Sequence, residues 1–287
     1  IAIEFPTPWS TDAADCISKG LAVHDTYKAH PLISTMFAPH APYTVSDNTL
    51  TRIRQLADEL NVPVQIHLHE TAKEVEDALS KNGVRPLQRL KELGLLNPSL
   101  MAVHATQLTA DEITILAQTG CSVVHCPRSN LKLSSGACPV ADLLSAGVNV
   151  ALGTDGAAAN NRLDLLAEMN MAALFGKFVA NDPTVLPASM MLELATLSGA
   201  RALGLDKEIG SLLPGKSADA VCIEFKDPGT HPVIDPLSQL VYAAGRENVT
   251  DVWIAGEHLL ENRTMTRMNE ESVMQKAGRW AERMAVS

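Results

Sequence analysis

Five short runs of consecutive apolar residues recur between residues 33 and 152, and segments with a helical pattern separate them. Apolar runs that do not alternate with polar residues are typical of strands buried on both faces, as in a parallel sheet. The runs cover residues 33–37, 62–66, 100–103, 121–124 and 148–152. Because strand and helix alternate, the pattern predicts the βα units of an α/β protein, and a closed barrel and an open doubly wound sheet both fit it.

The segments between these runs carry signals for the beginning of helices. Residues 50–60 repeat apolar side chains at every third or fourth position, which is the spacing of one helix face. Thr71 with Glu74, and Thr109 with Glu112, have the spacing of capping boxes. Each of these signals predicts a helix between two of the apolar runs.

The character of the sequence changes after about residue 206, where short apolar runs alternate with Gly and Pro. These runs cover residues 220–225, 237–243 and 252–255. They predict a small β region, and residues 270–284 predict a final helix. We therefore divide the chain into residues 1–206, with the βα units, and residues 207–287, with the small β domain and the final helix.

Composition narrows the class of partner and the compartment. The chain has 33 acidic and 23 basic residues and a formal net charge of −10, which repels phosphate backbones, so we expect no nucleic acid partner. No run of about 18 apolar residues could span a bilayer, and no secretory signal opens the chain, so no membrane partner is expected. The five cysteines form no C-x-x-C pair, which indicates reduced thiols and a cytoplasmic protein.

The first residues read as the interior of a strand. The chain begins with Ile1 instead of Met, and residues 1–5 are mostly apolar. We therefore expect residues 1–5 to form a strand and further sequence to precede Ile1.

Polar residues follow each of the five apolar runs at the point where a strand would end. They are His40; His67, His69 and Glu70; His104; His125 and Asn130; and Asp155. Because the carboxyl ends of parallel strands meet at one edge, we expect these side chains to lie close together. Five of the nine histidines fall at this edge, so we interpret the set as a metal or catalytic site. The other four, His24, His30, His231 and His258, are interpreted as structural.

The residue types at this edge suit metal-assisted hydrolysis. Imidazole nitrogen and carboxylate oxygen bind zinc, and zinc lowers the pKa of a water that it binds to about 7. Glu70 lies three residues after His67, where it can reach over a metal; a favourable charge at a helix N-terminus is the alternative interpretation. Alternate residues of a strand point the same way, so these residues alone leave open whether His69 is a second ligand.

Six motifs in a fixed order resemble one known family over nearly the whole chain. They are FAPHAPYT, IHLHET, AVHATQL, CPRSNLKL, ALGTDGAAANN and GSLLPGKSADAVCIE. This set resembles the amidohydrolase superfamily, and within it the branch of methylthioadenosine/S-adenosylhomocysteine deaminases. The resemblance implies a TIM-type (β/α)8 barrel, with strands from about 3 to 8 in residues 1–206 and the N-terminal strands outside this chain. It also implies a small β-sandwich domain.

The resemblance assigns a role to five of the residues. His67 is matched with the metal ligand of barrel strand 5. Asp155 is matched with a metal ligand that also acts as general base and contacts the substrate. Glu70 is matched with the catalytic residue that binds the adenine ring and moves a proton to it, and His104 with the catalytic histidine beside the attacking hydroxide. His40 is matched with a residue that binds the ribose of the substrate.

Other parts of the motifs are matched differently or depart from the family. On the same match His69 is not a ligand, and the Arg-Ser-Asn segment at residues 128–130 has a structural role. The family has an H-x-H pair of metal ligands at the end of strand 1, and nothing before His40 matches it. We therefore expect this pair upstream of Ile1. Many relatives also have Ser where this chain has Ala159.

Together these matches imply metal-dependent hydrolytic deamination of an adenine nucleoside, which is 5′-methylthioadenosine, S-adenosylhomocysteine or adenosine. The products are an inosine-type nucleoside and ammonia. The implied cofactor is one zinc ion per subunit, with another divalent metal as an alternative, and we expect a homo-oligomer whose partner is a small-molecule nucleoside. Two alternatives stay open: an amidohydrolase acting on another heterocycle such as a triazine or guanine, and a catalytically inactive barrel used for assembly. An open-sheet nucleotide binder would need a Gly-rich phosphate loop after a strand, and the sequence has none.

Overall fold

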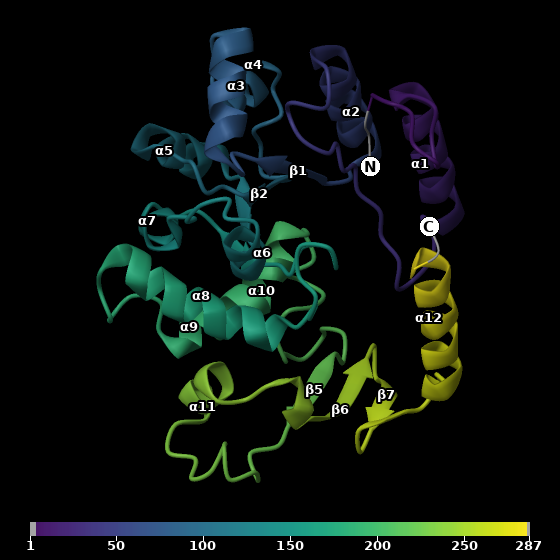
Figure 1. Ribbon diagram of the computed structural model, residues 1–287, viewed down its shortest axis with the longest axis vertical. Helices are drawn as coiled ribbons and strands as arrows, with labels where there is room; N and C mark the ends of the chain where they lie inside the picture. The colour runs from purple at the N-terminus through teal and green to yellow at the C-terminus, as the bar shows by residue number, and fades with distance from the viewer. Residues whose placement is uncertain (1–3, 286–287) are drawn as a thin grey trace.

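The structure is a computed structural model that describes residues 4–285, and a parallel sheet lies at its centre (Figure 1). Its strands, in spatial order, are β1 (Val64–Leu68), β2 (Leu100–His104), β3 (Ser122–His125) and β4 (Val150–Leu152). All three pairings are parallel. The α/β class and four of the five predicted strands are confirmed.

The first predicted strand, at residues 33–37, is wrong except at its last residue. Phe37 forms an isolated parallel bridge with Val64, and the chain continues beside β1 as far as His40. Gln65 N–H donates to the carbonyl oxygen of Phe37 at 2.9 Å, and His67 N–H donates to that of His40 at 3.1 Å. Pro39 has no N–H to donate, which explains why this segment extends the sheet without forming a continuous ladder.

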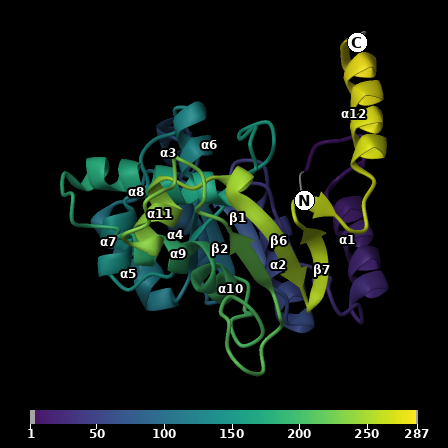
Figure 2. The ribbon, with the colours of Figure 1, turned by 90° about the horizontal axis from the view of Figure 1, so that it is seen from below.

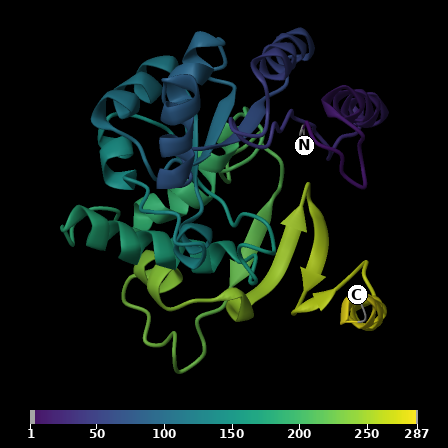
Figure 3. The same ribbon diagram turned by 45° about the horizontal axis from the view of Figure 1, so that its top comes forward.

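Helices follow the strands and form an arc around the outer side of the parallel sheet (Figures 1 and 3). They are α2 (Asp47–Leu60), α3 (Ala72–Asn82), α4 (Pro86–Glu92), α5 (Ala110–Thr119), α6 (Pro127–Lys132), α7 (Val140–Ser145), α8 (Leu165–Ala180), α9 (Ala188–Ala195) and α10 (Leu197–Ala202). A further helix, α1 (Ala13–Tyr27), precedes them. The predicted helix over residues 50–60 is confirmed as part of α2.

The two predicted capping boxes have different outcomes. Thr109 and Glu112 form a complete box at the start of α5, with each side chain accepting the backbone N–H of the other residue. At α3, Thr71 accepts from Glu74 N–H at 3.1 Å, but the Glu74 carboxylate accepts from residues that precede Thr71. The second box is therefore only half formed.

One core cluster fills the space between the sheet and the helices. Leu50, Leu116, Val123 and Val150 belong to it, and each is 0% exposed. Burial of such a side chain stabilises the fold by about 1.5–3 kcal/mol. The face of the sheet that points to the helices is thus fixed by apolar packing.

The C-terminal part contains an antiparallel sheet at the edge of the molecule (Figure 1). Its strands, in order, are β5 (Ala220–Ile223), β6 (Val249–Ile254), β7 (Glu257–Glu261) and β8 (Thr264–Met265). Within residues 4–285 this is the only sheet besides the parallel one, so the antiparallel sheet is confirmed and the β-sandwich stays a prediction.

The predicted β run at residues 237–243 is wrong, because this segment forms helix α11 (Pro236–Tyr242). Asp235 caps it by accepting from Leu237 N–H at 3.0 Å, and Pro236 occupies the first helical position, which it favours. Val241 is 1% exposed in the main core, and α11 packs against α8 and α9. Packing against two helices therefore favours a helix over a strand in this segment.

The first and last described segments of the chain differ in structure. Helix α12 (Glu270–Ala285) confirms the predicted final helix and stands away from the sheets (Figure 2). Of the predicted strand at residues 1–5, residues 1–3 lie outside the described part, and Glu4 and Phe5 form a bend. Within residues 4–285, no helix is both long enough and apolar enough to span a bilayer.

Candidate active site

His67, on β1, stands at the centre of a group of histidine rings. Its ring stacks on that of His104 with centroids 5.4 Å apart, and it meets the ring of His40 edge-on at 5.1 Å. His67 Nδ1–H donates to the carbonyl oxygen of His40 at 2.6 Å. This bond fixes the tautomer, so Nε2 carries a free lone pair.

Glu70 and His104 face each other where β1 and β2 end. His104 Nε2 lies 3.9 Å from Glu70 Oε2, and His104 Nδ1–H donates to Asn130 Oδ1 at 2.8 Å. The other carboxylate oxygen of Glu70, Oε1, accepts from Ser135 Oγ at 3.4 Å. The side chain of Glu70 is 20% exposed and that of His104 only 2%, so the carboxylate alone opens to solvent.

Asp155 follows β4 and is held by its own neighbours. Its Oδ1 accepts from Gly156 N–H at 2.7 Å, and its Oδ2 accepts from Ser129 Oγ at 2.7 Å. Within residues 4–285 no hydrogen bond or ion pair joins Asp155 to His67. The convergence of Asp155 on His67 therefore stays a prediction.

His40 lies at the rim of the group. Its Nδ1 shares a hydrogen bond of 3.0 Å with Thr44 Oγ1, and the ring of Tyr43 packs edge-on against it at 5.9 Å. Burial, and then the neighbouring His67, lower the pKa of His40, while Glu70 opposes the shift. His40 is therefore neutral at pH 7. Tyr43 is 59% exposed beside it, where an aromatic face is open to a ligand.

His69 lies apart from this group, inside a buried network. Its Nε2 accepts from Leu87 N–H at 3.0 Å, and its Nδ1–H donates to the carbonyl oxygen of Gln107 at 3.3 Å. Burial lowers its pKa, although Glu112, itself bound to Arg85 at 2.7 Å, opposes the shift. Both ring nitrogens have protein partners, so His69 has no lone pair left for a metal.

His125, the last residue of β3, is buried near His104. It is 1% exposed at the end of β3, and burial, with a contribution from His104, lowers its pKa to about 3. It is an uncharged residue of the interior at neutral pH.

Several of these residues have strained backbone where the strands end. His69, His104, Ala105 and Asp155 adopt the left-handed region, with φ of 52°, 75°, 49° and 62°. Each costs on the order of 1–3 kcal/mol, and such strain is typical of residues whose side chains must be aimed. The strain at His69 also explains why it departs from strand alternation and turns away from His67.

Two polar residues at the site were not expected from the sequence. Ser135 binds Glu70, and Thr106 Oγ1–H donates to the carbonyl oxygen of Glu70 at 2.7 Å. Thr106 stands in the AVHATQL motif, so the motif carried a signal for it. Ser135 lies in a loop after α6, and no spacing rule identifies it. Asn130, read as structural, contacts His104 directly.

The donor groups suit a zinc ion only in part. His67 has the arrangement of a metal-bound histidine, with one ring nitrogen held by a carbonyl and the other free, and Asp155 supplies carboxylate oxygen. Catalytic zinc takes three protein ligands. Among residues 4–285 no three His, Cys, Asp or Glu side chains are grouped to hold a metal.

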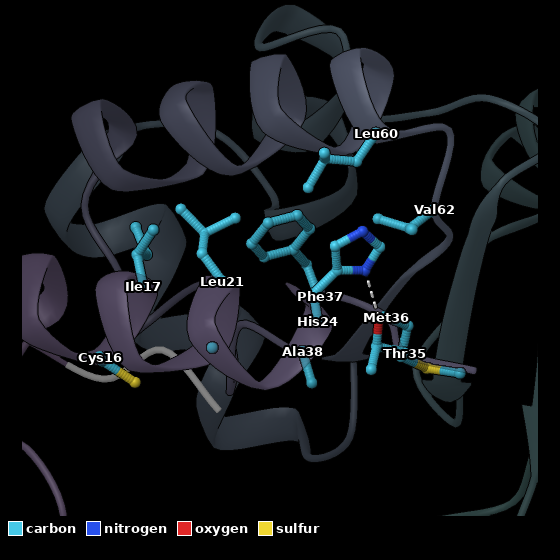
Figure 4. A pocket seen from close by; sticks show the side chains of 11 residues that line it. Cys16, Ile17, Leu21, His24, Thr35, Met36, Phe37, Ala38, Leu60 and Val62 are labelled. Atoms are coloured by element: carbon cyan, nitrogen blue, oxygen red, sulfur yellow. Dashed lines mark hydrogen bonds between the residues drawn. The ribbon is translucent and has the colours of Figure 1, made fainter. Parts of the chain in front are cut away.

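Two cavities lie away from these residues. A cavity of about 60 Å³ between α1, α2 and residues 35–38 is lined mainly by apolar groups, and His24 Nδ1 lies 2.7 Å from Thr35 Oγ1 in it (Figure 4). It has room for water but not for a nucleoside. A larger cavity of about 750 Å³ borders Asn61 and Pro98, which precede β1 and β2. It therefore lies at the amino ends of the strands, opposite Glu70.

The fold and the site define a class of protein. The chain belongs to the amidohydrolase family, whose sequence model matches residues 15–259. It is 50% identical over 282 residues to a 5-methylthioadenosine/S-adenosylhomocysteine deaminase of Teredinibacter turnerae, an alignment covering 98% of this chain. The chain spans 64% of the length of that relative.

Two solved structures are similar to this chain. The crystal structure of an adenosine deaminase from Xanthomonas campestris with bound zinc matches with a TM-score of 0.98 and 50% identity, covering all of this chain and 65% of that one. The zinc complex of an atrazine chlorohydrolase from Arthrobacter aurescens matches with a TM-score of 0.88 over 95% of this chain and 61% of that one. At 22% identity the second likeness concerns the fold alone.

Proposed function

We propose that this chain carries the reaction centre of a metal-dependent deaminase that acts on an adenine nucleoside. The substrate is 5′-methylthioadenosine, S-adenosylhomocysteine or adenosine, and the products are the inosine-type nucleoside and ammonia. The observation that carries the proposal is the meeting of His67, His104 and the Glu70 carboxylate at the ends of two neighbouring strands. The relatives named above, at 50% identity, favour this substrate class.

We further propose that the parallel strands belong to a (β/α)8 barrel. Residues 37–40 extend the sheet beside β1, and the helices follow an arc around it, as in one side of a barrel. Residues 1–206 would supply this side, and residues 207–287 would supply one sheet of a β-sandwich domain and the final helix. A homo-oligomer and a cytoplasmic location remain part of the proposal.

His67 and Asp155 would hold a zinc ion, or another divalent metal, by an imidazole nitrogen and a carboxylate oxygen. When bound, such an ion makes a water molecule acidic enough to act as a nucleophile at neutral pH. The bond from His67 to the His40 carbonyl would keep the ring oriented for this purpose.

The residues around the substrate divide the proton transfers among them. Asp155 would accept a proton from the attacking water, and Glu70 would donate one to N1 of the adenine ring as the water oxygen adds to C6. Asp155 would then pass its proton to the 6-amino group as the bond between C6 and that nitrogen breaks and ammonia leaves, and the remaining hydroxyl proton would return to Glu70. His104, held by Asn130, would stabilise the charge that develops at the tetrahedral carbon. His40, neutral at the rim, would bind the ribose.

A direct test is a deamination assay with the purified protein and added zinc. Conversion of adenine to hypoxanthine absorbance is expected with at least one of 5′-methylthioadenosine, S-adenosylhomocysteine and adenosine. Turnover of only guanine or a triazine would contradict the substrate class but retain the chemistry. A protein that binds zinc and turns over none of these compounds would contradict the proposal and favour an assembly role.

A further inference from the structure

The peptide groups on both sides of Glu70 are held by side chains, and one of these belongs to a residue that the reaction scheme does not use. We propose that Glu74 is a positioning residue that holds the backbone of Glu70 so that its carboxylate meets the adenine ring. The inference rests on the proposed role of Glu70 in proton transfer.

Glu74 uses its two oxygens on residues that precede its own helix. Oε2 accepts from Glu70 N–H at 2.7 Å, and Oε1 accepts from His69 N–H at 3.2 Å. Glu74 is only 6% exposed, so these are the contacts of a buried group. A carboxylate suits this task because both of its oxygens accept, whereas an amide offers one acceptor and one donor.

The opposite side of Glu70 is held as well. Thr106 Oγ1–H donates to the carbonyl oxygen of Glu70 at 2.7 Å. A Cβ at Gly136 would lie 2.8 Å from Thr106 Oγ1, so glycine at this position leaves the hydroxyl the room that it needs. The backbone of Glu70 thus has two short bonds, while the contacts of its side-chain tip are longer, at 3.4 Å to Ser135 and 3.9 Å to His104.

This arrangement differs from an ordinary helix start. In a capping box Glu74 would accept from the backbone of Thr71 and stabilise only α3. Its carboxylate instead passes over Thr71 to His69 and Glu70. His69 has φ of 52°, so the bond to its N–H also holds a strained turn that directs Glu70 toward His104.

The first experiment compares Glu74→Gln with Glu76→Gln. Glutamine keeps the shape of Glu74 but must turn an N–H₂ toward one of the two N–H groups. Glu76 is an exposed residue of the same helix and serves as the matched control. Since a displacement of about 1 Å can cost about 100-fold, we expect E74Q, assayed well above pH 7 where the Glu74 carboxyl is ionised, to lower kcat by about 10- to 100-fold with KM nearly unchanged. E76Q should match the wild type, and zinc content should be equal in all three.

A second comparison separates positioning from a general loss of structure. If Glu74 acts through Glu70, E74Q should have little further effect in an E70Q background, because residues of one network are not additive. An equal loss in both backgrounds, or a change in KM alone, would overturn the inference.

The inference can be tested even if the protein deaminates no nucleoside. The amide proton of Glu70, bonded to a carboxylate, is expected far downfield in an NMR spectrum of protein labelled with ¹⁵N-glutamate. E74Q should move it upfield, and E76Q should not. An unshifted signal in E74Q would reject the positioning contact, whereas absent turnover with the expected shift would reject only the proposed function.

Discussion

The two sheets of this protein differ in where their histidine and carboxylate side chains lie. Strands β2 and β4 of the parallel sheet are buried at every position, and their polar groups gather where the strands end. The strands of the antiparallel sheet are only partly buried. There His258 bonds Asp251 at 3.0 Å and stacks on Trp253 at 4.3 Å.

The two histidine–carboxylate pairs differ in how their members are held, and this difference favours the proposed reactive role of one pair and a structural role of the other. His258 and Asp251 satisfy each other directly, and hydrogen bonds from Thr250, Asn262 and His258 lower the pKa of the Asp251 carboxyl. His104 and Glu70 stay 3.9 Å apart because other groups hold each of them. A gap between two fixed groups would leave their lone pairs and protons available to the proposed substrate.

The largest effect should distinguish the two pairs by activity. Glu70→Gln removes the carboxyl group that is proposed to move a proton to the adenine ring, and it should lower kcat by about 10²- to 10⁴-fold, the range of general acid–base catalysis. Asp251→Asn, the matched change in the antiparallel sheet, should leave kcat within about twofold. Steady-state assays of both variants on the same nucleoside test this prediction. Equal losses of kcat would contradict the different roles assigned to Glu70 and Asp251.

Metal binding should distinguish the two histidines next. His67→Gln removes a proposed ligand, and we expect zinc content after dialysis and kcat each to fall by about 100-fold. His258→Gln should retain the metal of the wild type. Zinc measured by atomic absorption tests this, and full metal retention by H67Q would exclude His67 as a ligand.

Shortening an apolar side chain should cost more stability behind the parallel sheet than in the antiparallel sheet. Leu116 is 0% exposed behind the parallel sheet, so Leu116→Ala should lower the free energy of unfolding by about 2–5 kcal/mol. Val221, on β5, is 55% exposed, and Val221→Ala should cost under about 0.5 kcal/mol. Denaturant unfolding monitored by circular dichroism measures both. Similar costs would show that the two regions are equally well packed.

The contributions of Glu74 and Asp251 to the free energy of unfolding should depend on pH in opposite directions. Burial raises the pKa of Glu74 from 4.5 to about 7, so the folded state binds more protons than the unfolded state between these values. Its contribution to the free energy of unfolding is greatest below pH 4.5 and should fall by about 3 kcal/mol as the pH rises to 7.

The wild-type minus E74Q difference, measured by urea unfolding at several pH values, isolates this contribution. The wild-type minus D251N difference should show the reverse, because the pKa of Asp251 is lowered: its stabilisation is lost as the pH falls below 4. A flat E74Q difference would contradict the assignment of the raised pKa to Glu74.

The smallest effect should come from the hydroxyl opposite Glu74. Thr106→Val keeps the side-chain shape but removes the donor to the Glu70 carbonyl, and it should lower kcat by less than E74Q, about three- to tenfold. Thr114→Val, at a more exposed hydroxyl of α5, is the control. Kinetics of both variants test this, and a T106V loss larger than that of E74Q would reverse the ranking.

The sequence predicted elements well where burial alone decides them. Runs 62–66, 100–103, 121–124 and 148–152 correspond to β1–β4 because strands covered on both faces must be apolar throughout. It failed where tertiary contacts decide. Residues 237–243 are apolar in either conformation, and only packing against α8 and α9 selects the helix.

The site was predicted to a similar degree. Strand-end position and spacing identified His67, Glu70 and His104, whose convergence depends only on parallel strands ending at one edge. The orientation of the His69 side chain depends on β1 ending at Leu68 and on the left-handed backbone of His69, and no spacing rule predicts either. Thr106 and Ser135 act through loops, so their roles emerge only in three dimensions.

The capping box of α5 has a consequence for how this sequence can change. Glu112 caps the helix and also binds Arg85, which packs behind His69. The Glu112 carboxylate therefore connects the start of α5 to the residues behind His69. A substitution at residue 112 would disturb both. Tyr43 is exposed, so substitutions there would change the surface beside His40 without disturbing this connection.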